Sequence, residues 1–146
     1  MLSATCKYGI RAVIFIASQH DQKSNTGLKL IADELKVPQP YLAKILQILS
    51  RKKILKSTKG PHGGFCLQSP VAELTLMDII EAIDGGDFFD SCYVTGKKCN
   101  FDQPDLGVCI LHNDLRQEKM RLASFFRSKT IEALVQQVRN SPEIRI

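Results

Sequence analysis

The sequence predicts a mostly α-helical protein with one small β-hairpin. Apolar residues recur at helical spacing in several separate segments, whereas one short stretch, residues 54–67, has a strand–turn–strand pattern. A chain of 146 residues in which 44% are hydrophobic can form one domain, or a small domain with an accessory arm. These observations together predict a helical domain that carries a hairpin, followed by a C-terminal arm.

The first half of the chain predicts three helices. The first covers residues 3–19 and ends before the polar, turn-forming segment 21–27. The second is short and stops at residues 37–40 (Val-Pro-Gln-Pro), because proline fits the first turn of a helix but not its interior. The third turns five residues inward: Tyr41, Leu42, Ile45, Leu46 and Leu49.

The third predicted helix keeps a polar, basic outer face. That face carries Gln39, Lys44, Gln47 and Arg51. A short helix, a tight turn and a second helix with a polar face form the helix-turn-helix pattern. Many helical domains contain such a pair, so the segment that follows it decides how the pattern is interpreted.

A glycine-rich, basic hairpin follows the helix pair directly. Residues 54–58 predict a strand, residues 59–64 a turn (Lys-Gly-Pro-His-Gly-Gly) and residues 65–67 the returning strand. Such a hairpin is typical of the wing of a winged helix-turn-helix domain. Its glycines would let the backbone approach phosphates, and Lys59 could reach into a groove.

The second half predicts further helices around an irregular segment. Thr75 begins a helix, with Asp78 completing a capping box, and Gly85-Gly86 ends it. A long amphipathic helix covers about residues 110–126, and Thr130 caps a last helix. A long amphipathic helix without a second domain to cover it favours a dimer interface over a solvent-exposed arm. The chain therefore divides into a winged helix-turn-helix domain (1–85), a cysteine-containing loop (86–109) and a dimerisation helix with a C-terminal helix (110–146).

Charge is distributed unevenly between the two halves. Residues 1–70 carry a net charge of +8, and residues 71–146 a net charge of −3. This asymmetry suggests that the first half meets a polyanion, although a solvated basic surface would explain the charge equally well. The apolar run at residues 12–17 is too short to span a membrane, and no cleavage pattern follows it, so we expect a soluble, cytoplasmic protein with no membrane partner.

The cysteines indicate metal or redox chemistry rather than disulfides. Their number, five, is odd, and no secretory signal accompanies them. Cys92, Cys99 and Cys109 fall within 18 residues. Cys6 and Cys66 lie in predicted regular structure, where small buried cysteines are common, so we expect both to be structural.

Several of these segments together resemble the Rrf-two (Rrf2) family of winged-helix regulators, over nearly the whole chain. The matching segments are Cys6–Ala12, Ile31-Ala32, Pro40–Leu46, Lys59–Phe65, Leu76–Gly85 and Cys109–His112. The resemblance implies a homodimer whose long C-terminal helices cross. It also implies that each recognition helix enters a major groove of double-stranded DNA at a two-fold-related operator.

Carried over by position, the family's DNA contacts fall on the third helix and the wing. Gln39, Pro40, Tyr41 and Lys44 would face bases or phosphates, and Lys59 would enter the adjacent minor groove, beside the turn residues His62, Gly63 and Gly64. The sequence departs from the family pattern in having Lys59 where arginine is common and His62 where glycine is common. Lysine lacks a planar, bidentate fork, so sharp reading of a narrow groove is in doubt, whereas phosphate attraction is not.

In cluster-binding members, three cysteines before the long helix and a fourth ligand hold the metal. The corresponding residues here are Cys92, Cys99, Cys109 and His112. Thiolates suit iron, and an imidazole makes one corner of an iron–sulfur cluster more labile. The nine-residue gap before Cys109 is longer than the family pattern, and Tyr8 stands where some relatives have a carboxylate ligand.

The resemblance and the residues lead to a DNA-binding repressor that senses redox, iron–sulfur or nitric-oxide status through a two-iron or four-iron cluster. A regulator without a cluster, controlled by a metabolite or a partner protein, is the alternative. The same ligands would also suit tetrahedral zinc, or the thiols could hold no metal. We do not expect an enzyme, because residues 92–109 contain no Cys-x-x-Cys and no nucleophile constellation or nucleotide-binding loop is present.

Overall fold

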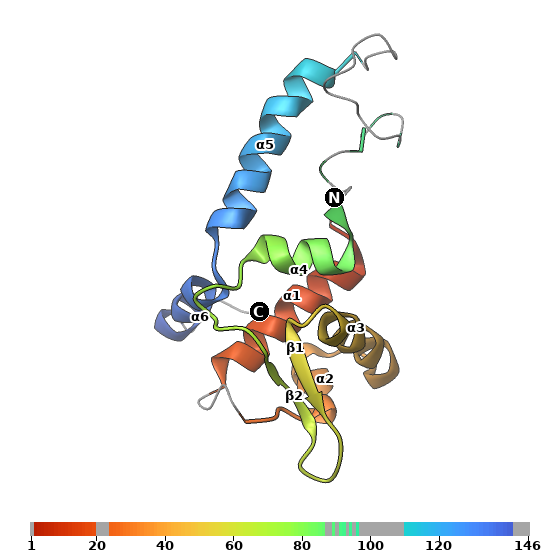
Figure 1. Ribbon diagram of the computed structural model, residues 1–146, viewed down its shortest axis with the longest axis vertical. Coiled ribbons are helices and arrows are strands. Elements are labelled where there is room, and N and C mark those ends of the chain that lie inside the picture. Colours follow the sequence, from red (N-terminus) through yellow and green to blue (C-terminus); the bar gives the residue numbers. More distant parts are fainter. Residues whose placement is uncertain are drawn as a thin grey trace.

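The computed structural model describes residues 2–19, 24–86, 89, 91, 92, 94, 96 and 110–141, except for the side chains of His112 and Asn113. Figure 1 shows the elements of this part of the chain. They are, in order, α1 (Ala4–Ser18), α2 (Leu28–Leu35), α3 (Gln39–Arg51), β1 (Leu55–Thr58), β2 (Gly64–Leu67), α4 (Leu76–Ile83), α5 (His112–Ser128) and α6 (Ile131–Asn140).

Helix α1 is the centre of the fold. It contacts α2, α3, α4, α6 and β2. It can do so because its apolar residues surround most of the helix, and its buried residues are Cys6, Gly9, Ala12, Val13, Ile14, Ile16 and Ala17. Ser3 caps its N-terminus, accepting a hydrogen bond from the Cys6 amide at 3.0 Å.

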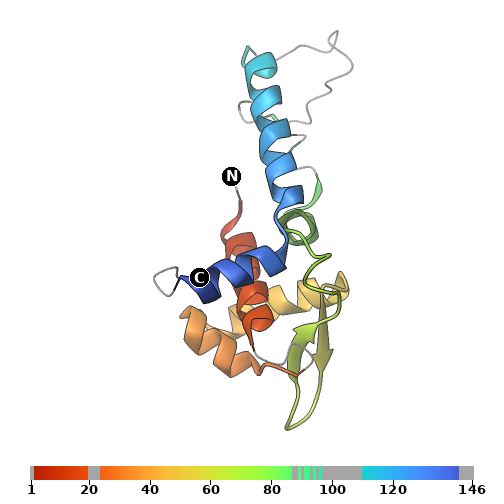
Figure 2. The ribbon, with the colours of Figure 1, turned by 90° about the vertical axis from the view of Figure 1, so that its left-hand side faces the viewer.

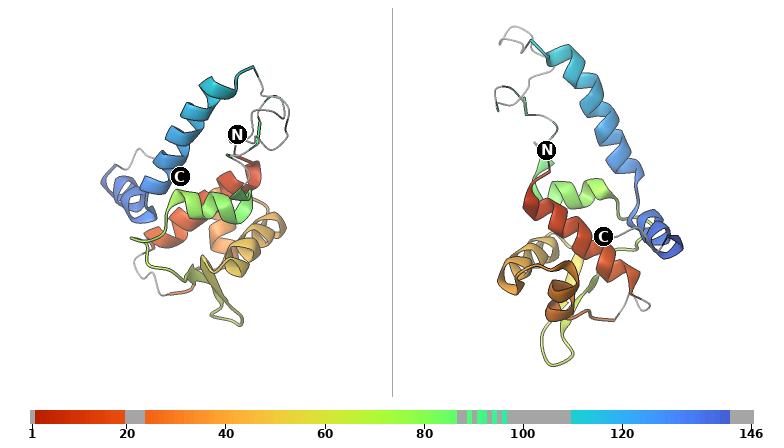
Figure 3. Two further views of the ribbon diagram at one scale, coloured as in Figure 1. Left: turned by 45° about the horizontal axis from the view of Figure 1, so that its top comes forward. Right: turned by 180° about the vertical axis from the view of Figure 1, so that it is seen from behind.

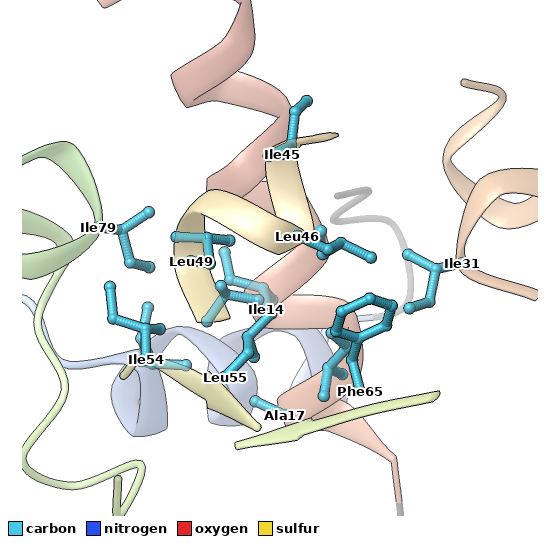
Figure 4. Close-up of a cluster of buried hydrophobic side chains, with 14 of the residues drawn as sticks. Ile14, Ala17, Ile31, Ile45, Leu46, Leu49, Ile54, Leu55, Phe65 and Ile79 are labelled. Atoms are coloured by element: carbon cyan, nitrogen blue, oxygen red, sulfur yellow. The ribbon is translucent and has the colours of Figure 1, made fainter. Parts of the chain in front are cut away.

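A single hydrophobic core joins the helices to the hairpin. In Figure 4, the side chains of Ile14, Leu46, Leu49, Leu55 and Ile79 converge from α1, α3, β1 and α4. All five are at most 8% exposed. Burial of such a side chain contributes about 1.5–3 kcal/mol, so this cluster holds the recognition helix and the wing on one rigid base.

The helix-turn-helix is closed by a left-handed residue and a proline. Lys36 ends α2 with φ of 54°, and the buried Val37 side chain then anchors the turn. Pro38 is the N-cap of α3, and Pro40 lies in its first turn, where a missing backbone N–H costs nothing. The predicted interruption at residues 37–40 is therefore confirmed.

The hairpin is antiparallel and extends from Leu55 opposite Leu67 to Thr58 opposite Gly64. Figure 2 shows it projecting from the end of the body opposite α5. Outside the hairpin, Thr26 forms a bridge with Phe65, in which the Thr26 amide donates to the Phe65 carbonyl at 2.8 Å and the reverse bond is 3.0 Å long. The wing therefore has a third short strand position supplied by the segment before α2.

Helices α4, α5 and α6 form the second half of the described chain. The predicted capping box of α4 is present, with Thr75 and Asp78 bonded to each other's backbone amides. Thr130 caps α6 as predicted, accepting from the Ala133 amide at 3.2 Å. Helix α5 begins at His112 and ends at Ser128, two residues later at each end than the predicted 110–126. It rises away from the body, and α6 returns to pack against α1 (Figure 3).

The expected fold class is confirmed: the chain is mostly α with a two-stranded wing, and a long C-terminal helix follows the winged helix-turn-helix. One side chain differs from the prediction. We expected Tyr41 to point inward with the apolar face of α3, but it is 37% exposed, because its ring packs on the surface of α1 instead of entering the core. No helix among the described residues is both long and apolar enough to cross a membrane.

Candidate nucleic-acid interface

The N-terminal half of α3 presents a polar surface on a rigid base. Gln39, Pro40 and Lys44 are exposed, whereas Leu42, Ile45, Leu46 and Leu49 on the opposite side are buried. The amphipathic spacing of α3 thus fixes which side chains point outward. All four α3 residues predicted to face DNA, Tyr41 included, lie on the solvent side.

Tyr41 is held in place by α1. Its hydroxyl lies 3.1 Å from the Thr5 hydroxyl, and its ring meets the edge of Tyr8 with centroids 5.9 Å apart. The Arg11 guanidinium lies 5.5 Å from the centre of the Tyr8 ring and donates to the Leu35 carbonyl at 3.5 Å. The sequence analysis missed Thr5 and Arg11, because helical periodicity does not show which residues of a partner helix they meet.

The turn of the wing depends on its glycines. Gly60 has φ of 108°, and the Gly63 amide donates to its carbonyl at 2.9 Å. A Cβ on Gly63 would lie 2.3 Å from the Thr58 carbonyl oxygen, and one on Gly64 would lie 2.5 Å from that of Thr26. Glycine is therefore required at both positions by the packing of the wing itself, whatever role its backbone has toward phosphates.

The two lysines of the candidate interface are available to a polyanion. Lys44 and Lys59 are both exposed, and no carboxylate in the described part of the chain lies within 4.0 Å of either ammonium group. His62 at the tip of the wing is exposed too. The wing lies at the end of the molecule that also carries α2 and α3, so both basic elements face the same end (Figures 1 and 2).

Only one of the four predicted metal ligands can be placed. The Cys92 side chain is 6% exposed, and its carbonyl accepts from the Gly96 amide at 2.8 Å. Cys99, Cys109 and the side chain of His112 lie outside the described residues. Within the described residues, no three His, Cys, Asp or Glu side chains form a group that could hold a metal ion.

A buried lysine joins the neighbourhood of Cys92 to α5. The Lys119 side chain is only 6% exposed, and its ammonium group donates to the Ser91 carbonyl. Burying an ammonium group is costly unless it is hydrogen-bonded. This contact therefore fixes the backbone next to Cys92 against the middle of α5.

Cys6 and Cys66 lie in the body, away from solvent. Cys6 is fully buried, and Cys66 is 7% exposed in β2. Burial raises the pKa of the Cys6 thiol to about 12, and the negative charge of Asp84 and a hydrogen bond to it contribute. Asp84 also accepts from the Ser3 amide at 2.9 Å and from the Ser3 hydroxyl at 2.5 Å.

Comparison with known proteins agrees with this geometry. The Rrf2 family, described as iron-dependent transcriptional regulators, matches residues 2–137. The chain belongs to the Rrf2 family. A protein of Aquifex aeolicus (strain VF5), assigned by name to the HTH-type transcriptional regulators, is 31% identical over 137 residues, 92% of this chain and 91% of that protein.

Two solved structures share the fold of this Rrf2 chain. CymR (YrzC), the global cysteine regulator of B. subtilis, superposes with a TM-score of 0.76 and 23% identity over 94% of this chain and 97% of that one. T. potens IscR gives 0.74 and 20% over 100% and 93%. Family membership makes this protein a DNA-binding transcriptional regulator and confirms the expectation that it is not an enzyme.

Cys6 should be inert in the folded protein. At pH 8 a thiol with a pKa of about 12 is ionised in about one molecule in 10,000, and only the thiolate reacts with iodoacetamide. Mass spectrometry should find Cys6 unmodified in native protein and modified in urea. Modification of native Cys6 at the rate seen in urea would contradict this.

The same pKa shift has a consequence for stability. The folded pKa is above the unfolded value of about 9, so the contribution is complete below pH 9 and is lost as pH rises toward 12. The free energy of unfolding should therefore fall more steeply above pH 9 in the wild type than in Cys6→Ala. Equal slopes for the two proteins would contradict the shift.

Proposed function

We propose that this regulator is a homodimeric repressor that binds a two-fold-related operator and responds to redox, iron–sulfur or nitric-oxide status through an iron–sulfur cluster. The observation that carries the DNA-binding part is the pair of exposed basic elements, α3 and the wing, at one end of the body. The proposal divides the chain by role: residues 1–85 bind DNA, the cysteine segment (residues 86–109) senses, and residues 110–146 dimerise.

The proposed complex places the start of α3 in a major groove. Gln39 and Lys44 then face base edges or phosphates, and Pro40 and Tyr41 lie against the backbone or the bases. The wing reaches the adjacent minor groove, where Lys59 neutralises phosphate charge near His62, Gly63 and Gly64. The exposure of Lys44 and Lys59 and the absence of a nearby carboxylate support this orientation.

Replacing Lys44 or Lys59 with Ala should weaken DNA binding and reduce its salt dependence. Each lost phosphate contact should lower the slope of log affinity against log salt by about one unit. The measurement uses a duplex selected from a random pool by the wild-type protein. Arg127→Ala, which removes one exposed positive charge from α5, should leave affinity and slope unchanged. Wild-type behaviour of both lysine variants would exclude this orientation of helix and wing.

The proposed dimer interface lies on α5. This helix leaves Met120, Leu122 and Phe125 exposed, at 62%, 38% and 48%, and Leu115 half-buried. A run of large exposed apolar side chains on a projecting helix favours a second copy as its cover. A two-fold dimer would hold the recognition helices about 34 Å apart, the spacing of successive major grooves.

Leu122→Asp should convert the dimer to monomers, because a carboxylate would be buried against apolar side chains. Ser124→Asp introduces the same charge at an exposed polar position of α5 and should remain dimeric. Sedimentation at micromolar concentration distinguishes these outcomes. A wild-type chain that sediments as a monomer would refute the interface.

The sensing part of the proposal assigns Cys92, Cys99, Cys109 and His112 as ligands. The burial of Cys92 and the anchoring of Ser91 to Lys119 support a fixed position for the first ligand, and the description of the family as iron-dependent supports iron. A bound iron–sulfur cluster would supply reversible redox chemistry and sensitivity to oxidants. The chain would supply three thiolates and one imidazole, and zinc or an empty thiol set are the other occupants to test.

Replacing Cys92, Cys99 or Cys109 with Ala should abolish cofactor retention, and His112→Ala should leave a more labile site. Cys6→Ala and Cys66→Ala, which remove buried thiols of the body, should retain the cofactor. Iron, sulfide and zinc contents and the visible spectrum of protein purified without oxygen report the outcome. Loss of the cofactor in a body variant but not in a segment variant would refute the ligand set.

One observation favours the alternative of a metabolite-controlled regulator. A hollow of about 520 Å³ lies between the end of α3 and α4, within the range of small-molecule sites. Lys52 and Lys53 line one side, and Asp78 and Glu81 line the other. Such walls suit a small zwitterion with one carboxylate and one ammonium group.

An amino-acid panel tests this alternative. An amino acid that binds the hollow should raise the unfolding temperature of the wild type but not of Glu81→Gln, and should change DNA affinity. The same panel should affect Glu118→Gln, an exposed α5 control, as it does the wild type. If no amino acid shifts the wild type, the alternative loses its support.

A further inference from the structure

The segment that precedes α2 holds the wing at two levels. At the base of the hairpin, Thr26 and Phe65 exchange two backbone hydrogen bonds of 2.8 and 3.0 Å, and Thr26 is 5% exposed. Close to the tip, the Asn25 side-chain amide donates to the His62 carbonyl at 3.2 Å. The second contact links two points 37 residues apart and reaches the turn itself.

The turn needs such a contact if it is to hold one position. An isolated two-stranded hairpin is marginally stable, and the residues 59–64 include three glycines, which have the greatest backbone freedom. Within the hairpin, the Gly63 amide already bonds to the Gly60 carbonyl. That bond closes the turn but does not orient it relative to α2 and α3, whereas the bond from Asn25 does.

The chemistry of the contact requires an amide or another short donor at position 25. The partner is a carbonyl oxygen, which only accepts, so the NH₂ group of Asn25 must face it. An alanine would remove the donor and leave the His62 carbonyl to water. Because Asn25 is half-buried and Thr26 is already fixed to the hairpin, the amide reaches His62 with little further loss of freedom.

We propose that Asn25 is a positioning residue for DNA binding, which orients the tip of the wing so that Lys59 meets the DNA in a fixed place. This inference rests on the proposed role of Lys59. Lys59 and His62 lie at the two sides of the same turn, so holding the His62 carbonyl restricts the arc through which the Lys59 backbone can swing. The entropic cost of ordering the wing is then met before DNA binds.

Asn25→Ala should weaken binding to the selected duplex about fivefold, the effect of one lost hydrogen bond of ordinary strength. Its salt slope should move toward that of Lys59→Ala. The double variant Asn25→Ala/Lys59→Ala should bind about as well as Lys59→Ala alone, since a misplaced wing has no lysine contact left to lose. Combined with Lys44→Ala, by contrast, the effects should multiply. Asn140→Ala, an exposed asparagine at the end of α6, is the matched control and should bind as the wild type does.

Hydrogen exchange gives a second readout that does not need DNA. In Asn25→Ala the Gly63 amide should exchange faster, while amides of α1 and α4 keep their wild-type rates. Unchanged exchange at Gly63 or wild-type DNA affinity of Asn25→Ala would overturn the inference, as would full multiplication with Lys59→Ala. If Lys59→Ala itself binds normally, the wing contact of the proposed function fails and the inference fails with it. If Lys59→Ala weakens binding and Asn25→Ala does not, the inference alone is wrong.

Discussion

Burial of α1 is the constraint on which the rest of the structure depends. Five elements pack on this helix, and each would lose part of its apolar cover without it. Gly9 shows how close the packing is, because a Cβ at this position would lie 2.2 Å from the Cδ1 atom of Ile83. The recognition helix and the wing are thus fixed relative to each other through a shared core, not through direct contacts at the DNA-facing surface.

The first two turns of α1 connect the two functional regions of the molecule. On one side, Ser3 and Cys6 meet Asp84, which closes α4 directly before Gly85 and the cysteine segment. On the other side, Thr5 and Tyr8 hold Tyr41 at the start of α3. A displacement of the end of α4 would therefore either move the start of α1 or break the Ser3–Asp84 bonds. This geometry gives a physical route by which a change beside the cysteine segment can reach the recognition helix.

Helix α5 combines exposure with one deep anchor. Its Lys119 is buried and bonded to Ser91, whereas Met120 next to it is 62% exposed. At its base, the Leu76 amide donates to the Lys129 carbonyl and the Ile131 amide to the Leu74 carbonyl, at 2.9 and 2.8 Å. The helix is thus attached rigidly at its base and to the backbone beside Cys92. A partner covering its apolar side would therefore touch the element that holds the cysteine segment.

The sequence by itself determined the helices, the wing and the outward residues of α3, because these follow from local periodicity, proline and glycine positions and caps. Tyr41 shows the limit, since its apolar character predicted a buried ring, and only the position of α1 decided that it packs on Tyr8 at the surface. The Asn25–His62 and Lys119–Ser91 contacts join residues 37 and 28 positions apart, and no local pattern predicts such pairs. The ligand set follows from spacing and resemblance alone, since of its side chains the described structure includes only that of Cys92. Tertiary packing decided these contacts because they depend on how separate elements approach one another, which the order of residues within each element does not encode.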